Sequence, residues 1–169
     1  FHHEEELLKS LSGKLKADPE HLLARVESLE KELKESRSQC EQLKAKLANA
    51  EVEDLAVVEY KDCSLIATNI PGMDRNALRN LGDSLKDKHK NAFILLASVE
   101  DGKPILMATA SDGAVKLGAH AGNLIKEIAP ILGGGGGGKP QMAQAGGKDS
   151  AKLEEALKQS LESMKKQLG

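Results

Sequence analysis

The sequence predicts an α+β protein: a long helical coiled-coil arm, residues 1–53, followed by a small α/β globular domain with a mixed sheet, residues 54–169. Two observations predict this division. In the first part, leucines recur at helical steps of three and four among charged residues, whereas short β-branched runs separated by turn residues follow it. Only 2% of the 169 residues are aromatic, so we expect an aliphatic core.

The arm begins with a helical pattern of leucines over residues 7–15. The stretch KADPEH then interrupts it. Asp18 is a candidate N-cap for the next helix, and Pro19 suits the first helical turn, where a missing amide hydrogen costs nothing. We therefore expect a second helix to begin at Pro19.

The second helix should extend to Glu53 and carry a heptad seam, because apolar residues alternate steps of four and three along it. One narrow stripe cannot be buried by a single helix. It must meet residues 7–15 in a hairpin, another copy of itself, or both. The seam consists of Leu22, Val26, Leu29, Leu33, Ser36, Cys40, Leu43, Leu47 and Ala50. The oligomerisation candidates among them are Leu22, Val26, Leu29, Leu33, Cys40, Leu43 and Leu47.

The globular domain should open with two strands, residues 55–60 and 64–70, because both runs are rich in β-branched residues. Asp74 is a candidate cap for a helix whose apolar residues are Ala77, Leu78, Leu81 and Leu85. Two apolar runs then flank Asp101-Gly102, a dipeptide typical of a tight hairpin. Pro104 should stand at the start or the edge of the returning strand.

A helix is predicted over residues 114–132, with Leu117, Leu124, Ile128 and Ile131 on or near one face. Gly118 and Gly122 lie four residues apart in it and should allow a neighbouring element to approach closely. A run of six glycines and an extended piece, residues 141–146, come next. A last amphipathic helix follows, capped by Asp149 or Ser150. Its apolar residues are Leu153, Leu157, Leu161, Met164 and Leu168.

Composition restricts the function. Lys and Arg number 24 against 26 Asp and Glu, so any nucleic acid must bind through a local basic face. The few aromatic residues do not favour stacking of splayed bases. Cys40 and Cys63 lack the spacing of metal ligands and are expected to be reduced thiols. No apolar run approaches about 20 residues, so we expect no membrane segment and a cytoplasmic protein. The abrupt start at Phe1 suggests a piece of a longer protein.

The glycine run allows three interpretations. Residues 133–139 fit the opening of a phosphate-binding loop, but Pro140 stands where a magnesium-binding hydroxyl is needed, and a helix precedes the run instead of following it. A flexible linker is the second interpretation. The third is a binding surface, because glycines leave main-chain amides uncovered. Lys139 and Lys148 flank this segment, and Gln141 and Gln144 add donors and acceptors suited to a folded RNA.

The segment GNLIKEIAPILGGGGGGKPQMAQAGGKD closely resembles the signature of the DHH-associated domain at the C-terminus of alanyl-tRNA synthetase. Lys139 stands where that family often has Arg. The coiled-coil segment also fits this C-terminal region. The positions that match the signature are Gly122, Lys126, Gly133 to Gly138, Lys139, Pro140, Ala143, Gln144, Ala145, Gly146 and Gly147.

The resemblance implies a domain that binds the tRNA for alanine at its outer corner and helps aminoacylation and editing to share one tRNA. Partners would be this tRNA, the catalytic and editing domains of the parent enzyme, and a second copy through the arm. The alternative is a structural dimerisation module with little RNA binding of its own. The candidate tRNA-binding residues are Lys126, Gly133, Gly134, Gly135, Gly136, Gly137, Gly138, Lys139, Gln141, Gln144, Gly146, Gly147 and Lys148.

The resemblance implies no catalytic residue, metal or cofactor in this chain, because the family uses ATP, magnesium and zinc in domains that are absent here. A phosphoesterase is a third interpretation, but the aspartate cluster and His-bearing motif of such enzymes do not occur. His89 and His120 are isolated and should have packing or surface roles. We interpret His2 and His3 as exposed polar residues.

Overall fold

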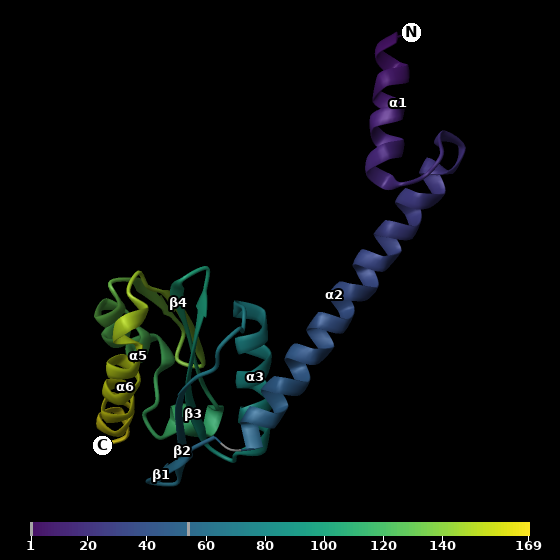
Figure 1. Ribbon diagram of the computed structural model, residues 1–169. Coiled ribbons are helices and arrows are strands. Elements are labelled where there is room, and N and C mark those ends of the chain that lie inside the picture. The colour runs from purple at the N-terminus through teal and green to yellow at the C-terminus, as the bar shows by residue number, and fades with distance from the viewer. Residues whose placement is uncertain (1, 54) are drawn as a thin grey trace. The chain divides into compact units, whose positions relative to one another are not determined.

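The computed structural model describes residues 2–53 and 55–169 and contains helices and one six-stranded mixed sheet (Figure 1). The α+β class with a mixed sheet is thus confirmed. The chain divides into two compact units, Phe1–Lys44 and Ala45–Gly169. The domain boundary that the sequence predicts adjoins residue 54, which lies outside the described residues, and it stays a prediction.

The first unit contains α1, His2–Leu15, the short 3-10 turn Pro19–His21, and the greater part of α2, Leu22–Glu53. Both predicted helices therefore form. Asp18 occupies the N-cap position with an extended backbone, but its side chain accepts no capping hydrogen bond. Its main-chain carbonyl instead accepts from the His21 amide at 2.8 Å. The expected side-chain cap is wrong, because the 3-10 turn satisfies this amide through the main chain.

The apolar seam of this unit stays largely exposed. No residue of α1 is buried. Along α2, Leu22 and Leu29 are half-buried, whereas Leu33 and Leu43 are 52% and 58% exposed. The side chain of Leu47 lies outside the described part of the chain. The described residues of this unit therefore form no core comparable with that of a globular domain.

The sheet of the second unit has the strand order β1-β2-β3-β4-β6-β5. Only β2 and β3 are parallel, and α3, Arg75–Lys88, forms the crossover between them. The other neighbouring strands are antiparallel. The strands are β1 Val58–Tyr60, β2 Cys63–Asn69, β3 Ala92–Glu100, β4 Lys103–Ala110, β5 Gly135–Gly138 and β6 Met142–Gly146.

The predicted hairpin and caps of this unit are confirmed. Asp101 and Gly102 both have positive φ, 49° and 75°, and join β3 to β4 in a two-residue turn. Pro104 is the second residue of β4. The Asp74 carboxylate accepts from the Ala77 amide at 2.8 Å at the start of α3. Asp149 likewise accepts from the Ala151 amide at 3.0 Å, before a 3-10 turn, Ser150–Lys152, leads into α6, Leu153–Leu168.

Helices cover both faces of the sheet, as Figure 1 shows for α3 on one side and α5 and α6 on the other. Alternate residues of each strand point to opposite faces. The core beneath α3 includes Ile66, Leu78, Leu85, Ile94 and Leu96. The core beneath α5 and α6 includes Phe93, Leu95, Leu124, Ile128 and Met164. The predicted aliphatic character holds beneath α3, whereas the core beneath α5 and α6 also contains the aromatic ring of Phe93.

The single helix predicted over residues 114–132 is wrong. The segment forms α4, Asp112–Lys116, then α5, Ala121–Ile128, and a 3-10 turn, Ala129–Leu132. Gly118 breaks the pattern with a φ of +113°, and a Cβ there would lie 2.6 Å from the Gln167 carbonyl oxygen of α6. Leu117 is 42% exposed and does not join the buried face. Packing against α6 therefore decides where α5 begins.

Candidate nucleic-acid interface

The glycine run contains a regular edge strand. Gly135–Gly138 form β5, which lies next to β6 at the edge of the sheet. The antiparallel register pairs Gly135 with Gly146 and Gly137 with Gln144. The segment is therefore not a flexible linker, and it leads into a strand where a phosphate-binding loop would lead into a helix. We call β5, the turn at residues 139–141, and β6 the β5–β6 hairpin.

Close packing within the hairpin and just before it requires glycine at three positions of the run. A Cβ at Gly134 would collide with the Gly146 carbonyl oxygen, and one at Gly136 with that of Gln144. At Gly138 the Met142 carbonyl oxygen blocks the same position. No side chain fits at these three positions, so the two strands can approach each other only because they are glycines.

Two other glycines, Gly135 and Gly137, leave room for a side chain. Nothing lies within 4 Å of a Cβ placed on Gly135, and at Gly137 the nearest atom is Lys126 Cε at an ordinary 3.7 Å. Neither residue has a φ in the left-handed region. The fold itself therefore does not demand glycine at 135 or 137, and their main chain is accessible to another molecule.

The N-terminus of α5 holds the turn of the hairpin. The amides of Ala121 and Gly122 donate to the carbonyl oxygens of Pro140 at 2.9 Å and Lys139 at 3.2 Å. Gly122 has no room for a Cβ, because the Gly138 carbonyl group occupies that position. The close approach expected of Gly118 and Gly122 is confirmed, although a break separates them. These contacts give the glycine strand a fixed position beside α5.

The candidate residues gather on this hairpin and at its ends. Lys126 projects from α5 beside Gly137. Lys139 and Gln141 are exposed at the turn. Lys148 lies at the opposite end, where its Cβ is 3.8 Å from a Cβ placed on Gly133, and its amide donates to the Leu132 carbonyl at 2.8 Å. The structure thus brings the predicted polar and glycine residues together on the β5–β6 hairpin and beside it.

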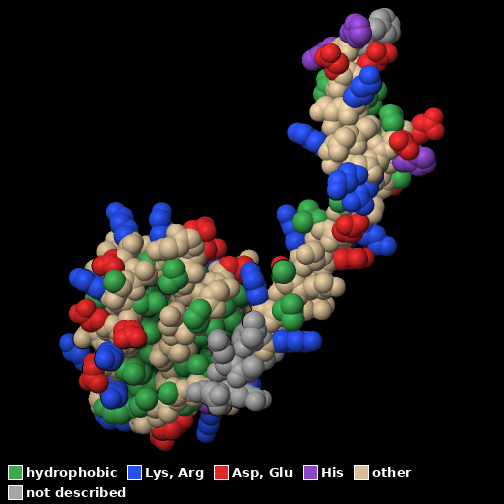
Figure 2. Space-filling view, viewed as in Figure 1, with side chains coloured by type: hydrophobic (Ala, Val, Ile, Leu, Met, Phe, Trp, Pro, Cys, Tyr) green, Lys and Arg blue, Asp and Glu red, His purple; other side chains and the backbone are tan. Residues whose placement is uncertain are grey.

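One basic neighbour of the hairpin was missed by sequence reasoning. Arg75, the first residue of α3, places Nη2 3.3 Å from a Cβ built on Gly146. No pattern along the chain links these residues, because the contact depends on the sheet order and on where α3 begins. On the face shown in Figure 2, basic and acidic side chains are interspersed over the globular unit.

Residues that could support metal chemistry have other roles. His120 Nδ1 accepts from the Asn123 amide at 3.0 Å and caps α5, in line with the expected packing role. Cys63 is buried and Cys40 is exposed, and both are free thiols. Within residues 2–53 and 55–169, no group of three or more His, Cys, Asp or Glu side chains is arranged to hold a metal. None of the described helices is long and apolar enough to cross a membrane.

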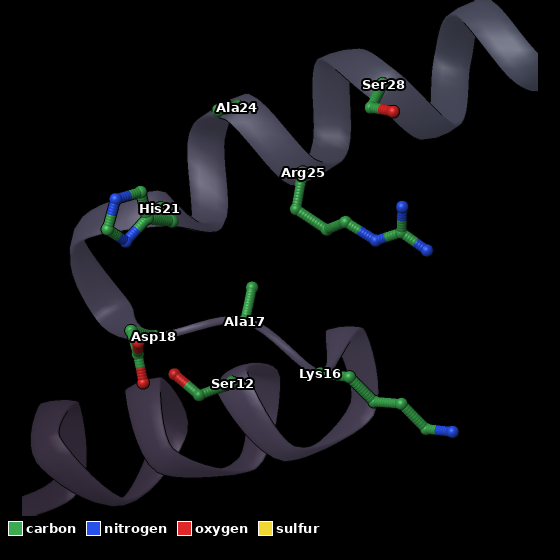
Figure 3. Close-up of a pocket in the computed structure, with 8 residues that line it drawn as sticks. All are labelled: Ser12, Lys16, Ala17, Asp18, His21, Ala24, Arg25 and Ser28. Atoms are coloured by element: carbon green, nitrogen blue, oxygen red, sulfur yellow. The ribbon is translucent and has the colours of Figure 1, made fainter.

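The first unit contains a cavity that the sequence did not predict. It lies at the bend between α1 and α2 and has a volume of about 660 Å³ (Figure 3). The residues that line it come from both sides of the bend and include Lys16, Asp18 and Arg25. The Ser12 hydroxyl oxygen is buried there without a hydrogen-bond partner among the described residues. The remaining lining residues are Ala17, His21, Ala24 and Ser28.

The family model described as "DHHA1 domain" matches residues 62–166. The chain belongs to the DHHA1 domain family. This confirms the resemblance to the DHH-associated domain seen in the glycine signature. The match contains the whole β5–β6 hairpin, α5, and all but the last two residues of α6, so the hairpin is part of the DHHA1 domain itself.

Curated relatives of this DHHA1 protein are alanine–tRNA ligases. Alanine–tRNA ligase 1 of Lachnoclostridium phytofermentans is 48% identical over 166 residues, which is 97% of this chain and 19% of that enzyme. The alanine–tRNA ligase of Acetivibrio thermocellus is 40% identical over 99% of this chain and 19% of its own length. The chain thus spans about a fifth of the length of these relatives.

Solved structures agree with this relationship. The C-Ala domain from Aquifex aeolicus alanyl-tRNA synthetase matches with a TM-score of 0.60 and 29% identity, covering 66% of this chain and 99% of that domain. The DHH domain of a member of the s1p family of ribosomal proteins matches with a TM-score of 0.53 at 18% identity, covering 85% of this chain and 33% of that protein. The second match shows the fold alone.

Proposed function

We propose that this chain is the C-terminal part of a cytoplasmic alanyl-tRNA synthetase and that its β5–β6 hairpin binds the outer corner of the tRNA for alanine. The observation that carries the proposal is the edge strand with two open glycine positions and cations beside it. The alanine–tRNA ligase relatives supply the class of ligand. By holding the tRNA away from the chemistry, the domain would help aminoacylation and editing to share one bound molecule.

Binding would be electrostatic and shape-selective. Lys126, Lys139 and Lys148 would neutralise phosphates, since phosphate contacts supply most of the affinity of RNA-binding surfaces and fix their orientation. The uncovered amides of Gly135 and Gly137, with Gln141 and Gln144, would lie near ribose or base edges. No covalent step is assigned to this chain. ATP, magnesium and zinc would serve other domains of the enzyme.

A titration with the tRNA at several salt concentrations tests this function. Lys139→Glu combined with Lys148→Glu should weaken binding and lower the salt slope by about one unit for each phosphate that is no longer neutralised. A charge-matched control is Lys61→Glu with Lys158→Glu. Lys61 lies in the turn beside β1, at the opposite edge of the sheet, and Lys158 lies on α6, which packs over β2 and β3. Equal effects of the two pairs would mean that only net charge matters and would refute the proposed surface.

The second candidate function is dimerisation through α2 as a coiled coil. It is favoured by the exposure of seam residues in a single chain, 40% at Val26, 52% at Leu33 and 58% at Leu43. A knobs-into-holes seam would bury these side chains against a second copy, with Leu22, Leu29, Cys40 and Leu47 in the same stripe. The two functions are compatible, because they use different parts of the chain.

Sedimentation of Leu33→Asp tests dimerisation, with Leu23→Asp as control because Leu23 is 76% exposed and lies off the seam. Conversion of a wild-type dimer to a folded monomer by Leu33→Asp alone supports self-association. If the wild type is already monomeric, and Leu33→Asp lowers helicity without changing the mass, the seam packs only within one chain.

A further inference from the structure

The β5–β6 hairpin has one face that α3 leaves open. On β4, Ile105 and Met107 belong to the core beneath α3. Their partners on β6 are Gly146 and Gln144, which in turn pair with Gly135 and Gly137 on β5. Because directly paired residues share a face, these four residues continue the α3 side of the sheet. Yet α3 packs on β3 and β4.

Residues on the other face of the hairpin are covered. Ala143 and Ala145 are 2% and 3% exposed and belong to the core beneath α5 and α6. On the α3 side, Gln144 and Gly146 are only half-buried, and Gly135 is exposed. The hairpin therefore presents a strip of sheet whose two outermost positions carry no side chain, at Gly135 and Gly137.

Arg75 stands at the inner border of this strip. Its guanidinium reaches the Cβ position of Gly146, while the neighbouring Asp74 carboxylate is engaged by the Ala77 amide at the start of α3. Among residues 2–53 and 55–169, none of the ion pairs involves Arg75. Lys126 lies beside Gly137 on the hairpin, and Lys148 lies just beyond its end, beside Gly133, so three cations from three separate segments lie at or next to the hairpin.

We propose that Arg75 is a phosphate-binding residue of this interface, and that the strip of Gly135, Gly137, Gln144 and Gly146 accepts the sugar–phosphate backbone of an RNA. The inference rests on the proposed function and adds a residue to it. A polyanion matches the three cations by charge. A guanidinium can hold two phosphate oxygens at once, and the missing Cβ atoms allow a backbone to lie directly on the main chain.

Arg75→Gln in the 169-residue chain tests this inference by titration with the tRNA. Removal of one charge-assisted hydrogen-bonding group at a phosphate should weaken binding about tenfold and lower the salt slope by about one unit. Lys88→Gln is the control, since it removes the same charge at the other end of α3, about 20 Å away at a rise of about 1.5 Å per residue. It should change neither quantity, because that separation exceeds the screening length at physiological salt.

Arg75→Lys separates the charge from the guanidinium fork. It should keep the salt slope of the wild type but lose part of the affinity, because an ammonium group cannot make the same paired contact. Ethylation of single tRNA phosphates gives an independent measurement. Ethylation at the contacted phosphate should weaken binding of the wild type and have no further effect on Arg75→Gln.

The outcomes separate the two proposals. If Arg75→Gln binds as the wild type does while Lys139→Glu with Lys148→Glu binds weakly, the inference about Arg75 is wrong and the proposed function stands. If the wild type binds no tRNA at all, both are wrong. A competition experiment compares polyglutamate with a second RNA of equal charge as displacers of the bound tRNA. If both displace it equally well, the strip binds any polyanion, peptides included, and the assignment to RNA backbone is wrong.

Discussion

The two units of the chain use leucine in opposite ways. In the globular unit, Leu95 and Leu96 on β3 are 0% exposed, between helices on both faces of the sheet. In the helical unit, Leu23 and Leu33 on α2 are 76% and 52% exposed. Leucine thus lies in a closed core in one unit and on an open stripe in the other. A leucine in a sheet covered by helices on both faces is surrounded by other side chains. A leucine on one side of a single helix has no such neighbours and stays exposed to solvent.

The largest expected effect contrasts the two kinds of leucine. Leu95→Ala should lower the free energy of unfolding of the globular unit by about 2–5 kcal/mol, because it leaves a cavity in a closed core. Leu33→Ala should leave the unfolding transition of the globular unit nearly unchanged. Urea unfolding of both variants measures this difference. If both variants lower the free energy of unfolding of the globular unit by similar amounts, the proposed difference between the buried Leu95 and the exposed Leu33 is wrong.

A second contrast lies within the glycine strand. Gly136→Ala should destabilise the globular unit by about 1–3 kcal/mol, since its Cβ would meet the main chain of β6. Gly135→Ala should instead stabilise it by about 0.4–1 kcal/mol, because the site is open and alanine loses less entropy on folding. Thermal unfolding of the pair decides. A matching loss at both sites would show that Gly135 is also needed by the fold.

The two predicted caps provide a smaller comparison between the units. Asp74→Ala should cost the globular unit about 1 kcal/mol, because the side chain satisfies the Ala77 amide. Asp18→Ala should change helicity of the first unit very little, since the Asp18 side chain makes no capping bond. Denaturant unfolding and far-UV circular dichroism measure the two effects. A marked loss of helicity in Asp18→Ala would contradict the geometry of this bend.

The smallest effect concerns the two cysteines. Burial, with a smaller contribution from the Glu59 carboxylate, raises the pKa of the Cys63 thiol from 9.0 to about 11. The unfolded thiol therefore loses its proton near pH 9 while the folded one keeps it, so stability from this group falls as the pH rises from about 9 to about 11. In the native protein, alkylation should label exposed Cys40 and spare Cys63. Rapid labelling of both thiols would show that the Cys63 side chain on β2 is accessible to solvent and would contradict its burial.

Local signals predicted much of the fold. The Asp101-Gly102 turn, the Asp74 cap and the leucine periodicity of α1 and α2 depend on neighbours along the chain, and all three were found. The break between α4 and α5 was not predicted, because Gly118 is placed by the carbonyl of Gln167 in α6. A helical period is a property of a segment, but the packing that interrupts it involves a distant one.

The candidate site divides in the same way. The signature of glycines and lysines is a local pattern, so the sequence alone predicted the family and the segment that holds the candidate site. Only the tertiary structure decided that Gly136 is required by strand pairing while Gly135 is open, and that Arg75 reaches Gly146. The physical reason is that identical residues differ only in what surrounds them. The register of β5 on β6 and the start of α3 set those surroundings, and neither is encoded in a local pattern.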